Sequence, residues 1–246
     1  MQTLTIITPP ICEPLSLADA KNHLRVDFTD EDQVIQDFIT QARDTIESYC
    51  RRVLVPQTWQ MTMDGFPGQH PLYTQRGFHS IHVPKPPFQS VVSLQYYDTS
   101  GTLQTLNATD GAGNVQPSTA MYGYKLDPGS DVQPARLSPP WARPWPPTRR
   151  IPQCVLLQFV AGYANAAAVA AALATWEAAN PTATAQQIAD QQARLMGQAV
   201  PPMIIAAIKL QLAYLYSNRG ELTDQKIQAL APGVIGCLSY YANWVA

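Results

Sequence analysis

Residues 14–56, PLSLADAKNHLRVDFTDEDQVIQDFITQARDTIESYCRRVLVP, decide how the N-terminal part of this chain folds. Their pattern predicts a helix, a short turn and a longer helix. Ser16 is placed to cap the first helix, with Asp19 three residues later, as in a capping box. The apolar residues of this helix fall on one face: Leu17, Ala20 and Leu24.

The second helix is expected to begin after the turn Asp27–Asp30, where Thr29 or Asp30 could accept hydrogen bonds from the free N–H groups. Its apolar residues repeat at the helical period and form a stripe wide enough for a core face. They are Val34, Ile35, Phe38, Ile39, Ala42, Ile46, Tyr49 and Cys50. Arg51 and Arg52 lie at the end that the helix dipole favours for cations, and Pro56 prevents any continuation.

The next segment, residues 53–163, holds most of the 22 prolines and has the pattern of strands and loops. Period-two alternation or a β-rich composition predicts several strands. These cover residues 58–63, 81–83, 91–97, 102–106, 122–126 and 154–160. The turn Asp98–Gly101 joins two of them into a hairpin.

Residues 164–200 are rich in Ala and Gln. They predict two helices, 166–179 and 184–196, which are broken at Asn180-Pro181. Few large side chains are present, so we expect an exposed helical hairpin or an element that packs on a neighbour. We also expect the fold to survive deletion of this insertion.

Residues 201–246 predict a strong helix that starts at Pro201 or Pro202 and stops near Gly220, and a last short helix from Val234 to about Trp244. Amphipathic helices far apart in the sequence should bury their stripes on each other. The predicted fold class is therefore α+β, a helical bundle built from the N- and C-terminal helices with an inserted β-rich subdomain. The expected segments are 1–52, 53–163, 164–200 and 201–246.

The chain carries little charge. Charged residues make up 14% of it and hydrophobic residues 46%, against an average of about 25% charged. Either the surface is polar and uncharged, or much of it faces other subunits. The net charge of −2 argues against tight DNA binding, which requires cations that neutralise phosphates, but it is compatible with a conduit through which DNA passes.

The four cysteines have no CxxC pair and are expected to be reduced and mostly buried. The N-terminus lacks the charged and apolar regions of a signal peptide, and no apolar run is long enough for a membrane span. We therefore expect no membrane association, and synthesis and use in a cytoplasm-like compartment.

The sequence offers no constellation that requires catalysis. His79 and His82 are a candidate zinc pair, but no third ligand is evident nearby, and a half-buried strand histidine is the simpler interpretation. None of the common nucleotide-binding, hydrolase or metalloprotease motifs occurs. We expect no enzyme, and assign no catalytic, cofactor-binding or metal-binding residue.

The aromatic residues are better candidates for contacts with a partner. Tyr240, Tyr241 and Trp244 crowd the last seven residues, and Trp141 and Trp145 lie in a proline-rich loop. Tyr and Trp dominate interface hot spots. The alternative for both groups is that they pack on the subunit's own core.

Two ordered blocks of sequence resemble the head–tail connector (adaptor) proteins of tailed bacteriophages. The first comprises Glu13–Lys21, Leu24–Val26 and Asp30–Asp32. The second comprises Phe159–Tyr163, Val200–Pro202 and Ile208–Arg219. Gly162-Tyr163-Ala164 departs from the Gly-Tyr-Gly of that family, and the segment between the last two parts is longer than in the family.

The resemblance implies a structural protein of the virion, located at the head–tail junction and assembled in the host bacterial cytoplasm. It implies a homo-oligomeric ring of twelve subunits beneath the portal protein, which extends the DNA channel and provides a platform for the next neck or tail protein. Genomic DNA would pass through without tight binding. A ring of this kind needs a head-to-tail interface between two different faces of the subunit.

A different class of function stays open from the residues alone. Exposed Trp141 and Trp145 could stack on sugars, as in a carbohydrate-binding or other β-type recognition module of a virion or cell surface. A glycosidase is less compatible with the sequence, because it needs two positioned carboxylates and the β-rich segment is poor in acidic residues.

Overall fold

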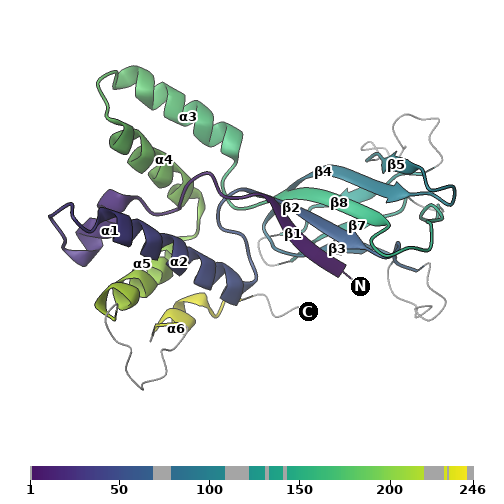
Figure 1. Ribbon diagram of the computed structural model, residues 1–246, viewed down its shortest axis with the longest axis horizontal. Helices are drawn as coiled ribbons and strands as arrows, with labels where there is room; N and C mark the ends of the chain where they lie inside the picture. Colours follow the sequence, from purple (N-terminus) through teal and green to yellow (C-terminus); the bar gives the residue numbers. More distant parts are fainter. Residues whose placement is uncertain are drawn as a thin grey trace. The chain divides into compact units, whose positions relative to one another are not determined.

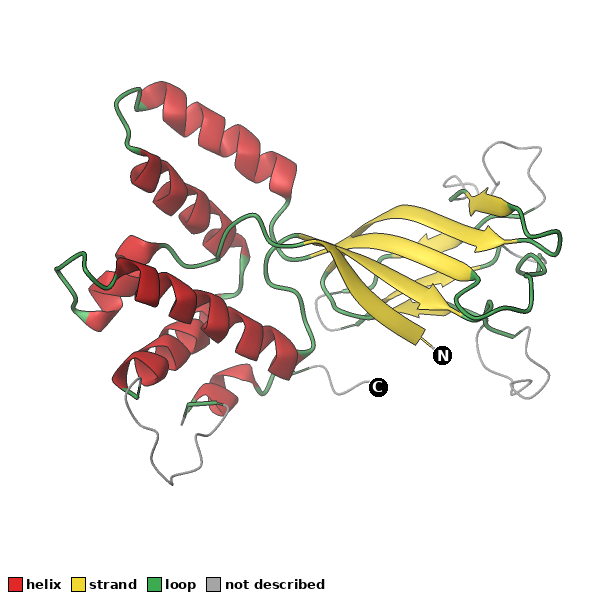
Figure 2. Ribbon diagram, viewed as in Figure 1, coloured by secondary structure: helices red, strands yellow, loops and turns green. Residues whose placement is uncertain are grey.

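The computed structural model describes residues 2–68, 79–108, 122–130, 133–140, 143–218, 230–231 and 233–242. The chain divides into two compact units (Figure 1). The β unit comprises residues 1–9 and 57–161, and the helical unit comprises residues 10–56 and 162–246. Figure 2 shows that the strands gather in the first unit and the helices in the second.

The β unit contains a five-stranded sheet with the order β1-β2-β8-β4-β5. Every neighbouring pair is antiparallel. The strands are β1 (Gln2–Thr8), β2 (Gln57–Met63), β8 (Val155–Ala161), β4 (Phe88–Tyr97) and β5 (Leu103–Leu106). β1 lies at one edge with all seven residues exposed, while the central strand β8 alternates buried and half-buried residues.

A smaller antiparallel sheet has the order β3-β7-β6. Its strands are β3 (Ile81–Val83), β7 (Ala135–Ser138) and β6 (Lys125–Asp127). Both sheets have one buried apolar face, as expected for two sheets that pack against each other. The buried residues of the small sheet are Ile81, Val83, Ala135 and Leu137, and those at the centre of the large sheet include Met61, Leu94, Leu157 and Phe159.

The helical unit contains α1 (Leu17–Leu24), α2 (Asp32–Cys50), α3 (Ala166–Ala179), α4 (Ala185–Ala199), α5 (Pro202–Ser217) and α6 (Val234–Leu238). α5 packs on α1, α2 and α6. Their shared core joins the apolar stripes of helices far apart in the sequence, and includes Ile35, Ile39, Ile46, Ile204, Ile208, Leu212, Val234 and Leu238. The predicted α+β fold and the predicted pairing of the N- and C-terminal helices are thus confirmed.

The start of α1 is as predicted, because the Ser16 hydroxyl accepts a hydrogen bond of 3.0 Å from the Asp19 N–H and donates one of 2.7 Å to the Asp19 carboxylate. The predicted start of α2 is wrong. Its N-cap is Glu31, whose side chain makes no capping bond, so neither Thr29 nor Asp30 fills that role.

The predicted strands are present, several with boundaries shifted by a few residues, and β4 and β5 form the predicted hairpin. Two strands were not predicted, β1 and β7. The last helix is shorter than predicted, since α6 ends at Leu238.

Candidate assembly surfaces

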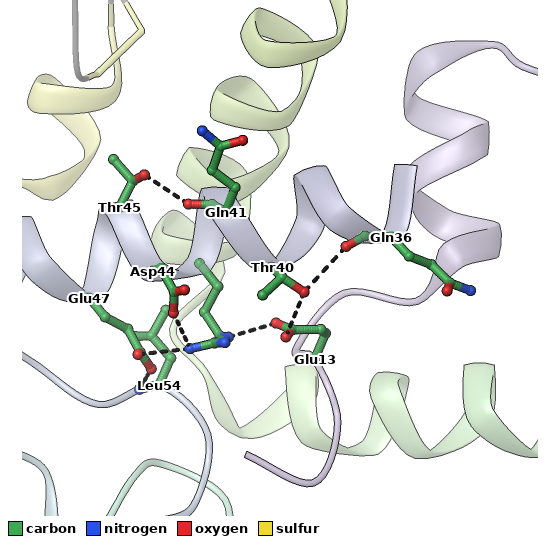
Figure 3. Close-up of polar contacts among 9 residues, drawn as sticks. Glu13, Gln36, Thr40, Gln41, Asp44, Thr45, Glu47 and Leu54 are labelled. Carbon is green, nitrogen blue, oxygen red and sulfur yellow. Dashed lines mark hydrogen bonds and ion pairs between the residues drawn. The ribbon is translucent and has the colours of Figure 1, made fainter. Parts of the chain in front are cut away.

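The chain passes between the two units at three points, after Pro9, Pro56 and Ala161. Within the helical unit, a cluster of charged residues around Arg43 of α2 contacts the segment that follows the first of these connections. Arg43, only 5% exposed, donates to the carboxylate of Glu13 at 2.7 Å. It also pairs with Asp44 at 2.8 Å and Glu47 at 2.9 Å (Figure 3).

Glu47 extends this cluster to the second connection, because its carboxylate accepts a hydrogen bond of 2.7 Å from the Leu54 N–H (Figure 3). The Leu54 carbonyl in turn accepts one of 3.2 Å from the Tyr163 N–H in the third connection. Burial alone would lower the pKa of Arg43, but its hydrogen bond and attraction to Glu13 and the neighbouring carboxylates raise that pKa. A buried charge with several partners is costly to leave unpaired, so the cluster fixes these segments.

Gly162 allows the second and third connections to lie in direct contact. Its φ of +133° is unfavourable for residues with a Cβ. A Cβ built on it would lie 2.7 Å from the Pro56 nitrogen and 2.7 Å from the Val55 carbonyl carbon. The close approach of the Val55 and Pro56 backbone therefore requires a glycine at position 162.

Arg52 ties the C-terminal segment to the same region. It is fully buried, its Nε donates a hydrogen bond of 2.5 Å to the Tyr241 carbonyl, and one terminal nitrogen donates to the Tyr163 hydroxyl at 3.0 Å. Its guanidinium also lies 5.7 Å from the centroid of the Tyr241 ring. The sequence predicts Arg52 at a helix end on grounds of the dipole, but its partners come from segments far along the chain.

The candidate contact residues of the C-terminus therefore differ from one another. Tyr241 packs on the helical core, whereas Tyr240 is 73% exposed and touches Tyr241 edge to face, with 5.1 Å between the ring centroids. Trp244 lies outside the described residues. Of the described residues of this group, Tyr240 is the exposed one and stays a candidate for contact with another chain.

The proposal that Trp145 contacts a partner is not compatible with its position. Trp145 is 4% exposed and stacks on Phe66 with 4.7 Å between the ring centroids. Its indole N–H donates to the His79 carbonyl at 2.5 Å. It is a core residue of the β unit and cannot stack on a sugar. Of the two tryptophans on which the carbohydrate-binding alternative rests, Trp145 therefore does not support it. Trp141 lies outside the described residues.

α5 carries an apolar stripe on the side opposite its core face. Met203 is 50% exposed and Leu210 is 40% exposed, and Ala206 and Ala213 lie on the same face of the helix. A helix that is apolar all round is usually covered on every side. This stripe is therefore a candidate subunit contact.

A groove of about 500 Å³ lies next to this stripe. α5 contributes Ile205, Ala206 and Lys209 to it, α4 contributes Arg194 and Gly197, and Asp19 comes from α1. Arg194 pairs with Asp19 at 3.2 Å. Lys209 takes part in none of the ion pairs that the described part of the chain forms.

The two helices of the insertion differ in how they pack. α3 buries only Val169, as its small side chains predicted. α4, in contrast, buries Ala193 and Met196, and Gly197 lies so close to Pro14 that a Cβ would be 2.3 Å from the Pro14 carbonyl oxygen. The expectation that the whole insertion adds little to the core is therefore wrong for α4.

Two of the described cysteines have thiols of low reactivity. Burial, with a smaller contribution from the charge of Glu13, raises the pKa of the Cys12 thiol to about 11, and burial raises the pKa of Cys50 to about 11 despite the nearby Arg52. Both are therefore protonated at neutral pH. Over the described ranges, no three His, Cys, Asp or Glu side chains are arranged to hold a metal ion. Among the described helices, none has the length and apolar character needed to cross a membrane.

Comparison with known families gives a match over residues 14–84 to the model of the phage gp6-like head-tail connector proteins. This match covers the first of the two sequence blocks except Glu13 and confirms the resemblance inferred from it. The family consists of structural connectors and not of enzymes. None of the curated proteins compared matches the chain.

Solved structures with the same fold cover nearly the whole chain. A chain in the virion of a native gene transfer agent particle is 17% identical, with a TM-score of 0.63, over 98% of this chain and 95% of that one. Two further matches, with the same coverages, come from necks of such particles. The neck of the empty particle, computed with C6 symmetry, gives 15% identity and a TM-score of 0.62. The neck of the native particle, computed with C12 symmetry, gives 17% and 0.61.

Proposed function

We propose that this chain, whose residues 14–84 match the gp6-like head-tail connectors of phages, is a structural protein of the neck of a phage-like particle. In this proposal it forms a homo-oligomeric ring of twelve subunits at the head–tail junction. The ring docks beneath the portal protein, extends the channel for DNA and offers a platform to the next neck or tail protein. Assembly takes place in the cytoplasm of the bacterial host.

Two comparisons agree and carry the proposal. Residues 14–84 match the head-tail connector family, and 98% of the chain shares its fold with a chain in the virion of a gene transfer agent particle. The C12 symmetry of one of the neck structures supports the subunit number. The exposed apolar stripe of α5 and the low content of charge fit a protein whose surface is largely covered by other chains.

The proposed protein partners and the proposed DNA require different properties of the surface. Portal and tail proteins need exposed aromatic or apolar anchors, and Tyr240 at 73% exposure is the residue that we assign to such a contact. DNA in a channel must move, so tight binding would be a disadvantage. A net charge of −2 leaves few cations for phosphates.

The experiment is mass photometry of the purified protein, alone and with the portal protein encoded by the same genome. We expect a multi-subunit species in at least one of the two conditions, and a complex with portal. A strict monomer in both conditions, without portal binding, would refute the proposed function.

A further inference from the structure

The outer faces of α2 and α5 have complementary character and lie on opposite sides of the packed helix pair. The two helices pack on each other through the stripes that include Ile35 and Ile39 on α2 and Ile204 and Ile208 on α5. The exposed stripe of each helix is therefore directed away from the other helix.

The outer face of α2 is acidic. Its exposed residues are Gln33, Val34, Asp37, Gln41, Asp44 and Ser48, a set with no Lys or Arg. Asp44 pairs with the buried Arg43, so Asp37 is the acid available to a partner. Val34 is 39% exposed and adds an apolar side chain to this face. The Asp37 carboxylate accepts a hydrogen bond of 3.0 Å from the neutral amide of Gln33, and it belongs to none of the ion pairs formed within the described ranges.

The outer face of α5 is apolar with a basic margin. Met203 and Leu210 are exposed, and Lys209 is half-buried and lines the groove together with Ala206. Among the described residues that line this groove, the only acid is Asp19, which pairs with Arg194 and also attracts Lys209, so two cations face one carboxylate. The margin therefore has an excess of positive charge.

We infer that the outer face of α2 in one copy of this chain binds the outer face of α5 in the next copy, with Asp37 paired to Lys209. The inference rests on the proposed ring. Two complementary faces on opposite sides of one subunit form a head-to-tail contact, and such contacts generate rings when the rotation closes. A two-fold dimer would instead bring identical faces together and place acid against acid on α2. The apolar residues Val34, Met203 and Leu210 become covered, and the charge pair fixes the register.

The test is a pair of charge reversals, Asp37→Lys and Lys209→Glu. Asp37 is exposed, so Asp37→Lys should keep the circular dichroism spectrum and melting temperature of the wild type. Lys209 also attracts Asp19 within the subunit, so Lys209→Glu should keep the spectrum but melt somewhat lower, and assembly is measured at a temperature where both variants are folded. Each variant alone places like charges at every contact. We expect its assembly, measured by mass photometry under the condition where the wild type assembles, to need about tenfold or more higher protein concentration.

An equimolar mixture of the two variants discriminates this contact from others. In the mixture, the reversed α5 face of the K209E variant can meet the reversed α2 face of the D37K variant, and the remaining contacts keep the native pair. Rings of alternating variants then have a matched contact everywhere when the subunit number is even. We expect the mixture, and also the double variant D37K/K209E, to assemble nearly as well as the wild type. Lys125→Glu, an exposed change of the same charge on β6, should have no effect.

The outcomes separate this inference from the proposed function. If the wild type assembles and the single reversals assemble equally well, or if the mixture fails like the single variants, the α2–α5 contact is wrong and the ring stands. If the wild type stays monomeric with and without portal, the ring fails and this contact fails with it.

Discussion

The Nε of Arg52 donates a hydrogen bond of 2.5 Å to the backbone carbonyl of Tyr241, across 189 positions of sequence. Arg52 follows α2, and Tyr241 lies three residues beyond the end of α6. The bond joins the described C-terminal segment to the residue that follows the end of α2. It also separates two neighbouring tyrosines, since Tyr241 faces Arg52 while Tyr240 is 73% exposed.

These two tyrosines provide a matched pair of variants. We expect Tyr241→Ala to lower the free energy of unfolding by about 1–3 kcal/mol, because it removes buried ring area and a cation–π contact. Tyr240→Ala should leave stability within about 0.5 kcal/mol and weaken portal binding. Urea unfolding and a portal-binding titration measure the two effects separately. Equal loss of stability in both variants would show that Tyr240 also belongs to the core.

Substitution of Gly162 should be among the most damaging changes in the chain. Gly162→Ala places a Cβ 2.7 Å from the backbone of Pro56 at a φ of +133°, and we expect a loss of at least about 2 kcal/mol. Gly236→Ala is the control, because nothing lies within 4 Å of its Cβ position and α6 should gain up to about 1 kcal/mol. Urea unfolding of both variants checks this. A stable Gly162→Ala protein would mean that the connections can separate.

Two methionines test whether α4 belongs to the core. Met196 is 2% exposed and Met203 is 50% exposed. Met196→Ala should cost about 2–4 kcal/mol through the cavity that it leaves. Met203→Ala should cost less than about 1 kcal/mol and weaken ring assembly instead. The expectation that the insertion is dispensable would regain support if Met196→Ala proved neutral by thermal melting.

The hairpin between β4 and β5 should lose stability in acid. Hydrogen bonds from the Ser100 hydroxyl, and next from Gln104, lower the pKa of Asp98 from 3.8 to about 2. A carboxylate with a lowered folded-state pKa stabilises the fold above the unfolded value, and this contribution disappears as the pH falls through the folded value. The melting temperature of the wild type should thus exceed that of Asp98→Ala at about pH 6, and the difference should shrink between about pH 4 and about pH 2. A difference that is constant over this range would mean that the charge of Asp98 does not matter.

Binding to double-stranded DNA should be weak and should weaken further with salt. The net charge of −2 leaves few cations to neutralise phosphates, so we expect a dissociation constant above about 1 µM at physiological salt. Fluorescence anisotropy with a labelled duplex at several salt concentrations measures it. Submicromolar binding would contradict the proposal that the channel binds DNA weakly. It would indicate that Lys and Arg side chains of neighbouring subunits come together when the ring closes.

The helices could be predicted from sequence because their signals are local. Ser16 with Asp19, the 3.6-residue period of α2 and the Pro at the start of α5 each act within a few residues. The edge strand β1 escapes prediction because all seven of its residues are exposed, so the alternation of a buried and an exposed face is missing from its sequence. The roles of Arg52 and Trp145 escape prediction for a different reason. Their surroundings come from distant segments, and a single sequence does not reveal which residues meet there.

The measurement that tests the account most directly is electron microscopy of the purified protein bound to its portal protein. The account predicts image averages of a closed ring of twelve copies, coaxial with the portal, with the helical units of neighbouring subunits in contact. Averages that show only single subunits or two-fold dimers, with no density added to the portal, would contradict it.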